Sequence, residues 1–218
     1  MPKFRARSSV LRMNDGTAGY EKDIEHLVQR FESISFGALH REVLSLFPSP
    51  PAAVLDIGAG SGRDAAAFAA LGYEVTAVEP SAGLRQRAQA LHPSSRIAWI
   101  DDRLPALGTL RAPFDVVMLT AVWMHLAPEE RPRAMARVAA LMKPGGLACL
   151  TLRHGAVPKG RRMFEVSGAD TIRLAEAQGL VPIVHLENQV ALSGAPGVTW
   201  TRLAFRKAGG LDAGTAAP

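Results

Sequence analysis

The stretch Val54-Leu55-Asp56-Ile57-Gly58-Ala59-Gly60-Ser61-Gly62-Arg63-Asp64 decides the fold. Apolar residues lead to a carboxylate, three glycines follow at alternate positions, and an alanine-rich segment begins. This pattern predicts a buried strand that turns tightly into a helix. Because glycine lacks a Cβ, a ligand can approach the main chain of such a turn closely, and the following helix presents unpaired N–H groups. The stretch therefore indicates a small-molecule site.

The spacing of the glycines distinguishes between classes of cofactor. The pattern G-x-G-x-x-G is typical of a dinucleotide site. Its third glycine would stand where the chain has Arg63. The chain instead reads D-x-G-x-G-x-G, and Asp56 places a carboxylate where it suits the ammonium group of a cationic ligand. The loop therefore favours a nucleoside that carries an amino acid over NAD. A glycine turn that serves only helix–strand packing is the alternative.

Length and composition predict one globular domain with a full core. The chain has 218 residues, of which 48% are hydrophobic and 21% charged. No apolar run reaches the roughly 18 residues of a membrane span, and no secretory signal pattern is present. The single Cys149 stands in an apolar run, so we expect it to be a buried strand residue and expect neither an intramolecular disulfide nor a multi-cysteine zinc site. A cytoplasmic location, no membrane partner and no metal site are expected.

The net charge of +5 is concentrated at the start of the chain. Four of the 25 Lys and Arg residues, and no Asp or Glu, lie in residues 1–12, so the remainder is nearly neutral. We interpret residues 1–13 as a disordered basic arm. A start at Met13 and a transit peptide are the alternatives. Residues 209–218, rich in Gly and Ala, are expected to be a disordered tail. The nearly neutral body argues against a nucleic-acid partner.

Residues 14–208 are expected to form a single domain, with a helical cap at 14–50 and an α/β core at 51–208. Helical spacing predicts two cap helices between residues 20 and 47, interrupted around 33–37. Core helices are expected at residues 65–71, 84–91 and 129–142. Strands are expected before the glycine turn and at residues 73–78, 97–100, 114–120, 147–152, 180–186 and 198–206.

Strands that alternate with helices at this spacing predict a right-handed parallel α/β sheet. The last two strand segments have little helix between them. A closing hairpin would therefore leave one antiparallel strand in an otherwise parallel sheet.

Four motifs in order resemble those of the class I S-adenosylmethionine-dependent methyltransferases, especially the small-molecule enzymes of bacteria. They are the glycine stretch at 55–62, the acidic strand end at 75–81, the fourth-strand motif at 114–117 and the turn at 141–146. The resemblance implies a Rossmann-like, doubly wound sheet of seven strands whose last strand is antiparallel. It also implies S-adenosyl-L-methionine as the cofactor.

The resemblance implies roles for the residues of the first two motifs. Gly58, Ala59 and Gly60 would pack against the methionine and ribose portions of the cofactor. Asp56 would orient the loop and help hold the amino group. Glu79 would accept hydrogen bonds from both ribose hydroxyls, since a carboxylate offers two acceptor oxygens. Ala59 stands where the family frequently has cysteine.

Further cofactor contacts are implied at the ends of the next two strands. Asp101 would accept a hydrogen bond from the adenine amino group, with Asp102 as the neighbouring candidate. The alternative for both is a turn-forming role. Thr120 would contribute its backbone carbonyl near the methionine amino group. Tyr20, in the cap, is a candidate for covering the methionine end.

Substrate chemistry is expected after the fourth and fifth strands, because ligands of open α/β sheets bind beyond the carboxyl ends of the strands. His125 and His154 stand there and are the candidate general bases, since a neutral imidazole can take a proton near pH 7. The alternative for His125 is a helix-entry residue bonded to backbone. Trp123 is a candidate for a pocket wall or for the core, and His40 for a substrate lid.

A basic, glycine-bearing loop follows the fifth strand and could hold an anionic substrate group, although a solvated run of charge is the favoured interpretation. Its cations are Arg153, Lys159, Arg161 and Arg162.

The sequence therefore predicts an S-adenosylmethionine-dependent methyltransferase that moves a methyl group to O, N or S of a small-molecule acceptor by in-line displacement. An RNA methyltransferase that uses the basic arm, and a non-catalytic cofactor-binding module, are the alternatives. The nearly neutral body and the missing Asn/Asp-Pro-Pro-Tyr signature argue against the first of these.

Overall fold

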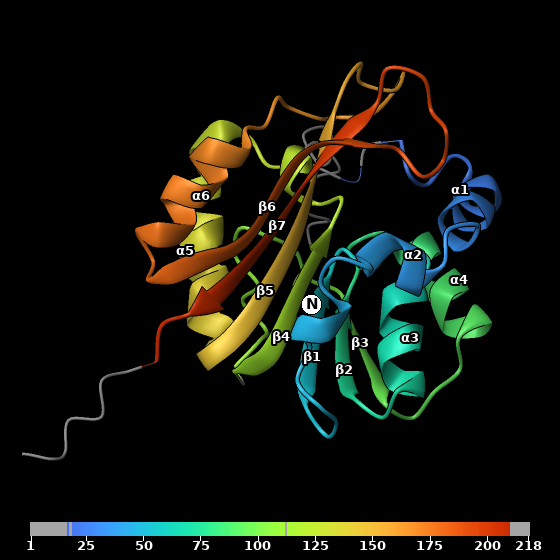
Figure 1. Ribbon diagram of the computed structural model, residues 1–218. Coiled ribbons are helices and arrows are strands. Elements are labelled where there is room, and N and C mark those ends of the chain that lie inside the picture. Colours follow the sequence, from blue (N-terminus) through green and yellow to red (C-terminus); the bar gives the residue numbers. More distant parts are fainter. Residues whose placement is uncertain (1–16, 18, 112, 210–218) are drawn as a thin grey trace, which may run out of the picture.

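A seven-stranded sheet flanked by helices on both faces forms the body of the computed structural model (Figure 1). The structure describes residues 17, 19–111 and 113–209. The predicted basic arm at 1–13 and nearly all of the predicted tail at 209–218 lie outside the described residues. The strand order is β3-β2-β1-β4-β5-β7-β6, and β7 runs antiparallel to both of its neighbours. The Rossmann-like sheet with one antiparallel last strand is confirmed.

The order of the sheet puts the glycine turn near its middle, because the turn follows β1, which lies between β2 and the central strand β4. The strands are β1 (Ala53–Ile57), β2 (Glu74–Val78), β3 (Ile97–Ile100), β4 (Phe114–Thr120), β5 (Met142–His154), β6 (Leu180–Val190) and β7 (Thr199–Lys207).

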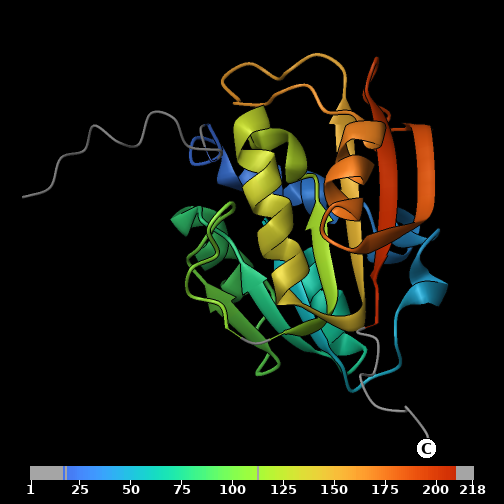
Figure 2. The same ribbon diagram turned by 90° about the vertical axis from the view of Figure 1, so that its left-hand side faces the viewer.

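The helices form two outer layers and a cap. Figures 1 and 2 show α3 and α4 on one side of the sheet and α5 and α6 on the other. The helices are α1 (Ile24–Glu32), α2 (Phe36–His40), α3 (Arg63–Ala70), α4 (Ala82–Leu91), α5 (Arg131–Leu141) and α6 (Gly168–Glu176), with short 3₁₀ turns η2 (Leu44–Leu46), η3 (Trp123–His125) and η4 (Pro128–Glu130).

Successive residues of β4 show how the two layers share the sheet. Val116 and Met118 pack in the apolar cluster that contains Phe68 of α3, whereas Val117 and Leu119 pack in the cluster of α5 and α6. Successive side chains of a strand point to opposite faces, so a strand covered on both sides is apolar throughout. Cys149 is buried in β5, as predicted.

The structure differs from the predicted elements in the second half of the chain. The helix expected at 129–142 begins as the turn η4 and continues as α5 to Leu141. Strand β5 begins at Met142, and residues 143–146 form an irregularity in its pairing with β4 where a turn was predicted. Helix α6 was not predicted. It begins at Ser167, whose hydroxyl accepts a hydrogen bond from the Asp170 N–H.

The cap lies against the start of α4. A Cβ at Gly83 would lie 2.2 Å from Cδ1 of Ile24, so the bare glycine permits the close approach of α1. The Ser81 hydroxyl donates to Glu21 Oε1 at 2.7 Å and accepts from the Leu84 N–H. The same serine therefore caps α4 and ties the N-terminal segment to the end of β2.

Asp115 joins three segments at the opposite edge of the sheet. Its Oδ2 accepts from the Ala53 N–H that opens β1 and from Lys143 Nζ, both at 2.8 Å. Burial opposes ionisation of Asp115, but these hydrogen bonds outweigh it and lower its pKa. Asp115, in the motif at 114–117, is thus a brace that links β4 to the first residue of β1 and to the first residues of β5.

Asp115→Ala should lower the free energy of unfolding by roughly 1–3 kcal/mol, because a backbone donor and an ammonium lose a charged acceptor. Urea unfolding followed by circular dichroism measures the change. Asp170→Ala is the matched control. It removes an exposed ion pair with Arg173, and such pairs contribute about 0–1 kcal/mol. Equal losses in the two variants would show that Asp115 is not a brace.

Candidate functional site

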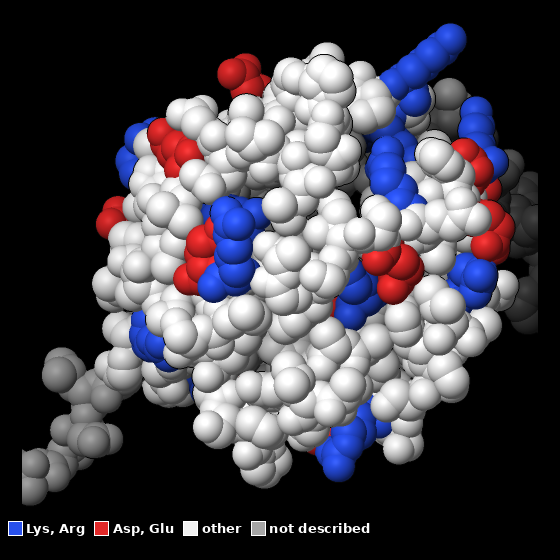
Figure 3. Space-filling view, turned by 45° about the vertical axis from the view of Figure 1, so that its right-hand side comes forward, with Lys and Arg blue, Asp and Glu red and all other residues white. Residues whose placement is uncertain are grey.

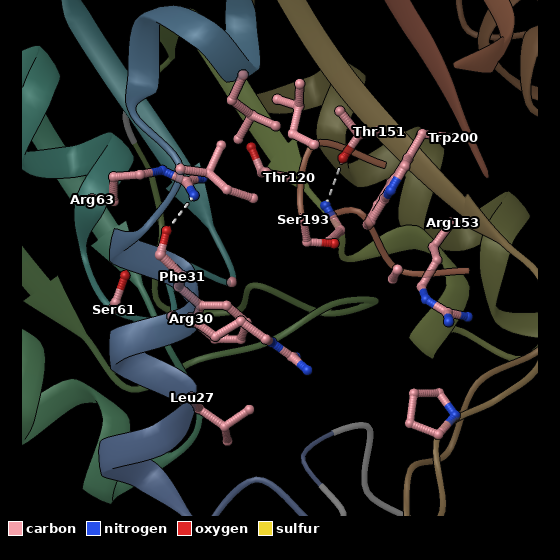
Figure 4. A pocket seen from close by; sticks show the side chains of 18 of the residues that line it. Leu27, Arg30, Phe31, Ser61, Arg63, Thr120, Thr151, Arg153, Ser193 and Trp200 are labelled. Atoms are coloured by element: carbon pink, nitrogen blue, oxygen red, sulfur yellow. Dashed lines mark hydrogen bonds between the residues drawn. The ribbon is translucent and has the colours of Figure 1, made fainter. Parts of the chain in front are cut away.

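Two cavities meet beyond the carboxyl ends of the parallel strands, which is where ligands of open α/β sheets bind. The larger encloses about 630 Å³ and is lined by the glycine turn, α1 and the segments that follow β5 and β6 (Figure 4). The smaller encloses about 130 Å³ and is lined by the end of β2 and the loops after β3 and β4. Tyr20, Gly58 and Ala121 line both cavities, so the two are compartments of one site.

The glycine turn is shaped by positive φ angles of 70°, 57° and 85° at Gly58, Gly60 and Gly62. Its N–H groups bond within the protein: those of Gly58 and Ala59 donate to the Val78 carbonyl at 2.7 and 3.0 Å. They do not form a cradle for phosphate, in agreement with the exclusion of a dinucleotide. A Cβ at Gly58 would lie 2.6 Å from Val122 Cγ2, so this position requires glycine for space as well.

Asp56, the carboxylate that precedes the turn, is only 1% exposed and lines the larger cavity. Its Oδ2 is buried without a hydrogen-bond partner among the described residues. Burial raises its pKa well above the usual value, and the neighbouring Asp64 carboxylate raises it further. A cationic group in the cavity would satisfy this oxygen and favour the ionised form.

Glu79 follows β2, lines the smaller cavity and holds the glycine turn through a hydrogen bond. Its Oε2 accepts from the Gly60 N–H and its Oε1 from the Ser81 N–H, both at 2.8 Å. Burial raises its pKa to about 6, although these N–H groups oppose the shift. Each oxygen keeps a further lone pair, so the carboxylate can accept two more hydrogen bonds from a ligand.

The two aspartates after β3 differ in placement. Asp101 is exposed and forms an ion pair with Arg85 at 3.0 Å, away from the lining of either cavity. Asp102 lines the smaller cavity, and its carboxylate accepts hydrogen bonds from the Thr109 N–H and hydroxyl. Of the two, the structure brings Asp102 to the site.

A buried polar network lies behind the glycine turn, and sequence reasoning missed its centre, Asp64. Its Oδ2 accepts from His40 Nε2 at 2.8 Å and from the Thr120 hydroxyl at 2.9 Å, and its Oδ1 from Arg63 at 2.7 Å. Burial opposes ionisation, but His40 and Arg63 outweigh it and lower the pKa of Asp64. The sequence feature that could have indicated this network is the pair Arg63-Asp64 at the start of an alanine-rich helix. His40, a predicted lid residue, lies in this network and is 3% exposed.

The end of β4 is held in an uncommon conformation. Ala121 has a φ of 60°, which is strained for a residue with a Cβ, and its N–H donates to the Thr151 hydroxyl of β5 at 2.9 Å. Thr120 lines the larger cavity, as do Ala59 and Gly60 of the glycine turn. These residues form the floor on which a ligand beyond β1 and β4 would rest.

Tyr20 and His125 form a hydrogen-bonded pair where the cavities meet. His125 Nδ1 lies 2.8 Å from the Arg162 carbonyl oxygen, which can only accept, so Nδ1 carries a proton. Nε2 lies 3.0 Å from the Tyr20 hydroxyl. Burial lowers the pKa of His125, and Arg161 and Arg162 lower it further, which favours the neutral ring. Tyr20 therefore donates to Nε2 and presents its oxygen to the site.

The remaining predicted residues lie outside this pair. His154 lines neither cavity, and its Nε2 lies 2.8 Å from the Thr201 hydroxyl of β7. Trp123 is fully buried in the core. Sequence reasoning also missed the lining contributed by α1, by the segment before β7 and by β7 itself, which includes Leu27, Arg30, Phe31, Ser193 and Trp200 (Figure 4).

In the described part of the chain, no group of three or more His, Cys, Asp or Glu side chains is arranged to hold a metal ion. None of the helices there has the length and apolar composition needed to cross a bilayer.

His125 should titrate below its ordinary pKa of about 6.5, because burial and the two arginines disfavour the charged ring. Histidine ¹H–¹⁵N NMR spectra recorded between pH 5 and 8 measure this, and at pH 7 they should show the proton on Nδ1. Tyr20→Phe removes the donor to Nε2 and should shift that nitrogen's resonance. A midpoint at or above 6.5, or an Nε2 proton at pH 7, would contradict the assigned pair.

Comparison with known proteins agrees with this geometry. Residues 54–146 match the model of a family described as a methyltransferase domain. The chain is 27% identical over 127 residues to an uncharacterized methyltransferase of Geobacillus kaustophilus, with 58% of each chain covered. It is 33% identical over 125 residues to an uncharacterized methyltransferase of Mycobacterium bovis, which covers 54% of this chain and 62% of that one. The matches thus span about three fifths of each relative.

A solved structure shares the fold over most of its length. It is the 1,6-didemethyltoxoflavin-N1-methyltransferase of Burkholderia thailandensis, with 1,6-didemethyltoxoflavin and S-adenosylhomocysteine bound. It superposes with a TM-score of 0.61 at 22% identity and covers 84% of this chain and 89% of its own. Residues 54–146 thus match a methyltransferase-domain family, and the order of the sheet agrees with the fold of this solved methyltransferase.

Proposed function

We propose that the protein is an S-adenosylmethionine-dependent methyltransferase that moves a methyl group to O, N or S of a small-molecule acceptor by in-line displacement. One observation carries this proposal. Asp56 lines the larger cavity, and one of its carboxylate oxygens is buried without a hydrogen-bond partner among the described residues, while Glu79 lines the adjoining smaller cavity. An unpaired buried acceptor and a carboxylate with spare lone pairs suit the ammonium and the ribose of one ligand.

Each of the two cavities would hold one part of the cofactor. The smaller would hold the adenosine, with Glu79 accepting from the ribose hydroxyls and Asp102 nearest to the adenine. The larger would hold the methionine portion over the glycine turn, where Asp56 accepts from the amino group. Asp101, which pairs with Arg85, would act on the adenine only after that ion pair opens.

Gly58, Ala59 and Gly60 would pack against the cofactor between these ends, and Thr120 would contribute its carbonyl. Tyr20 borders both compartments and would cover the cofactor where they meet. These roles follow from the positions of the residues around the cavities and from the family's motifs.

The cofactor supplies an activated methyl group on its sulfonium, so the protein's main task is to hold the acceptor in line. Such positioning can contribute roughly 7–11 kcal/mol in favourable cases. The larger cavity continues beyond the glycine turn to α1 and the β5–α6 segment, which leaves room for an acceptor. Its volume lies within the range of about 300–1,000 Å³ that is typical of small-molecule sites.

The Tyr20–His125 pair is the candidate for removing a proton from the acceptor. Neutral His125 accepts from the Tyr20 hydroxyl, so Tyr20 can pass its hydroxyl proton to Nε2 while its oxygen takes the proton of the acceptor, which leaves Tyr20 neutral and His125 as the imidazolium. His154 lines neither cavity, so its use as a base would require the β5 end to rearrange.

A small-molecule acceptor has further support. The similarly folded Burkholderia enzyme is named for a small-molecule substrate. On the face shown in Figure 3, Lys and Arg side chains alternate with acidic and uncharged areas, and the described residues there form no continuous basic surface of the kind that binds nucleic acid.

The proposal predicts saturable binding of S-adenosylhomocysteine that weakens as the pH falls. Glu79, with a pKa of about 6, must be ionised to accept two hydroxyl donors, and Asp56 must be ionised to accept the ammonium. Affinity should therefore be full at pH 7.5 and fall by about tenfold for each pH unit below 6 for one such group. Isothermal titration calorimetry between pH 5 and 8 measures this.

Glu79→Gln should bind more weakly at pH 7.5 and show a shallower pH dependence. Glu187→Gln alters an exposed residue of β6 and should behave as the unchanged protein. Absence of any binding would end the proposal. Binding without methyl transfer to any of a broad panel of metabolites would identify a non-catalytic cofactor-binding module instead.

A further inference from the structure

The larger cavity carries more positive charge than its carboxylates neutralise. Two of its arginines, Arg63 and Arg202, form ion pairs at 2.7 and 2.6 Å. Four further cations line it, and none of them forms an ion pair with a carboxylate of the described residues: Arg30, Arg153, Lys159 and Arg161.

The donors of these cations are largely unused. Arg153 donates one long hydrogen bond, 3.3 Å to the Gly155 carbonyl. Arg161 lies over the Tyr20 ring at 3.5 Å, and its buried Nη1 lacks a partner in the described chain. Arg30 lies over the Phe31 ring at 5.5 Å. A guanidinium offers five N–H donors, so each of these side chains retains donors for a ligand.

The three guanidinium groups come from distant segments and share one space. Figure 4 shows Arg30 of α1 and Arg153 of β5 extending from different walls into the same opening. Burial lowers the pKa of Arg153 and of Arg161, and the positive charge of Arg30 lowers both further, although Tyr20 opposes the change at both and Asp23 opposes it at Arg161. Like charges gathered without a counter-ion are unfavourable, and a bound anion would relieve the repulsion.

Apolar side chains form one part of the remaining wall, beside polar residues such as Thr120 and Ser193. The apolar part includes Leu27, Phe31 and Ile34 of the cap, together with Met124, Met163 and Trp200. A ligand that fills this space needs an apolar body, because burying unpaired polar groups against such a wall is unfavourable. The cavity therefore combines an apolar wall with a cluster of unpaired cations.

We propose that the acceptor is a small amphipathic acid, with an apolar body against the cap and a carboxylate or phosphate held by Arg30, Arg153 and Arg161. This inference rests on the proposed function, because it assigns the acceptor compartment of the same site. The cofactor brings a single carboxylate, which one cation suffices to neutralise, so the remaining cations face the acceptor.

The test measures binding to protein saturated with S-adenosylhomocysteine, which leaves only the acceptor compartment open. Calorimetry would compare benzoate with benzamide, and phenyl phosphate with phenol, so that each pair differs mainly in charge. At least one anion should bind about tenfold or more tightly than its neutral partner, since charge-assisted hydrogen bonds are the strong ones. The two pairs distinguish carboxylate from phosphate.

Arg153→Gln should weaken the preferred anion about tenfold and leave the affinity for S-adenosylhomocysteine within about twofold. Arg173→Gln, at an exposed site on α6, should change neither affinity. Equal affinity for the charged and neutral partners, or no binding of either, would overturn the inference. A loss of S-adenosylhomocysteine affinity in Arg153→Gln with anion binding unchanged would also overturn it, because the cation would then serve the cofactor.

If S-adenosylhomocysteine does not bind at all, the proposed function fails first. The same probe pairs are then titrated into the ligand-free protein. A preference for the anion that Arg153→Gln abolishes would support the anion site independently, and no preference would reject it.

Discussion

Three carboxylates are buried around the glycine turn, those of Asp56, Asp64 and Glu79, and the surrounding structure has to supply their hydrogen-bond partners. Burying a charge is unfavourable unless it is paired and hydrogen-bonded. Asp64 meets this condition through His40, Arg63 and Thr120, which ties the cap, α3 and β4 together. Glu79 meets it through backbone N–H groups and so fixes the turn to the end of β2. One oxygen of Asp56 has no hydrogen-bond partner in the described chain, and in the proposed function it accepts from the ammonium group of the cofactor.

Most of the fold could be predicted from sequence because its elements carry local signals. Apolar runs and glycine turns are readable within about ten residues, and the order of strands and helices follows the alternation of these signals. Helix α6 was missed because its nine residues follow a long segment without periodicity, and its stability comes from packing on β6 and α5. The first strand pairing of β5 was missed because it depends on a partner in β4.

The sequence could bring together the residues that are proposed to hold the cofactor for the same reason, whereas it could not place side chains that meet from distant segments. Asp56 and Glu79 stand at the ends of neighbouring strands, so topology alone brings them together. The contact between Tyr20 and His125 joins residues 105 positions apart, and that between His40 and Asp64 crosses from the cap to the core. Sequence spacing cannot show which nitrogen of His125 holds the proton, because that depends on the carbonyl it meets.

The family match covers only some of the segments that line the two cavities. The family match ends at residue 146 and contains the glycine turn, Glu79 and Asp102. Arg30, Arg153, Arg161 and Trp200 all lie before or after it, although they line the same space. Two proteins that share this domain can therefore have the same glycine turn and acidic residues while they differ in the flanking residues that line the same cavity. Under the proposed function, the family match therefore covers the residues that hold the cofactor, and the flanking segments carry the residues proposed to bind the acceptor.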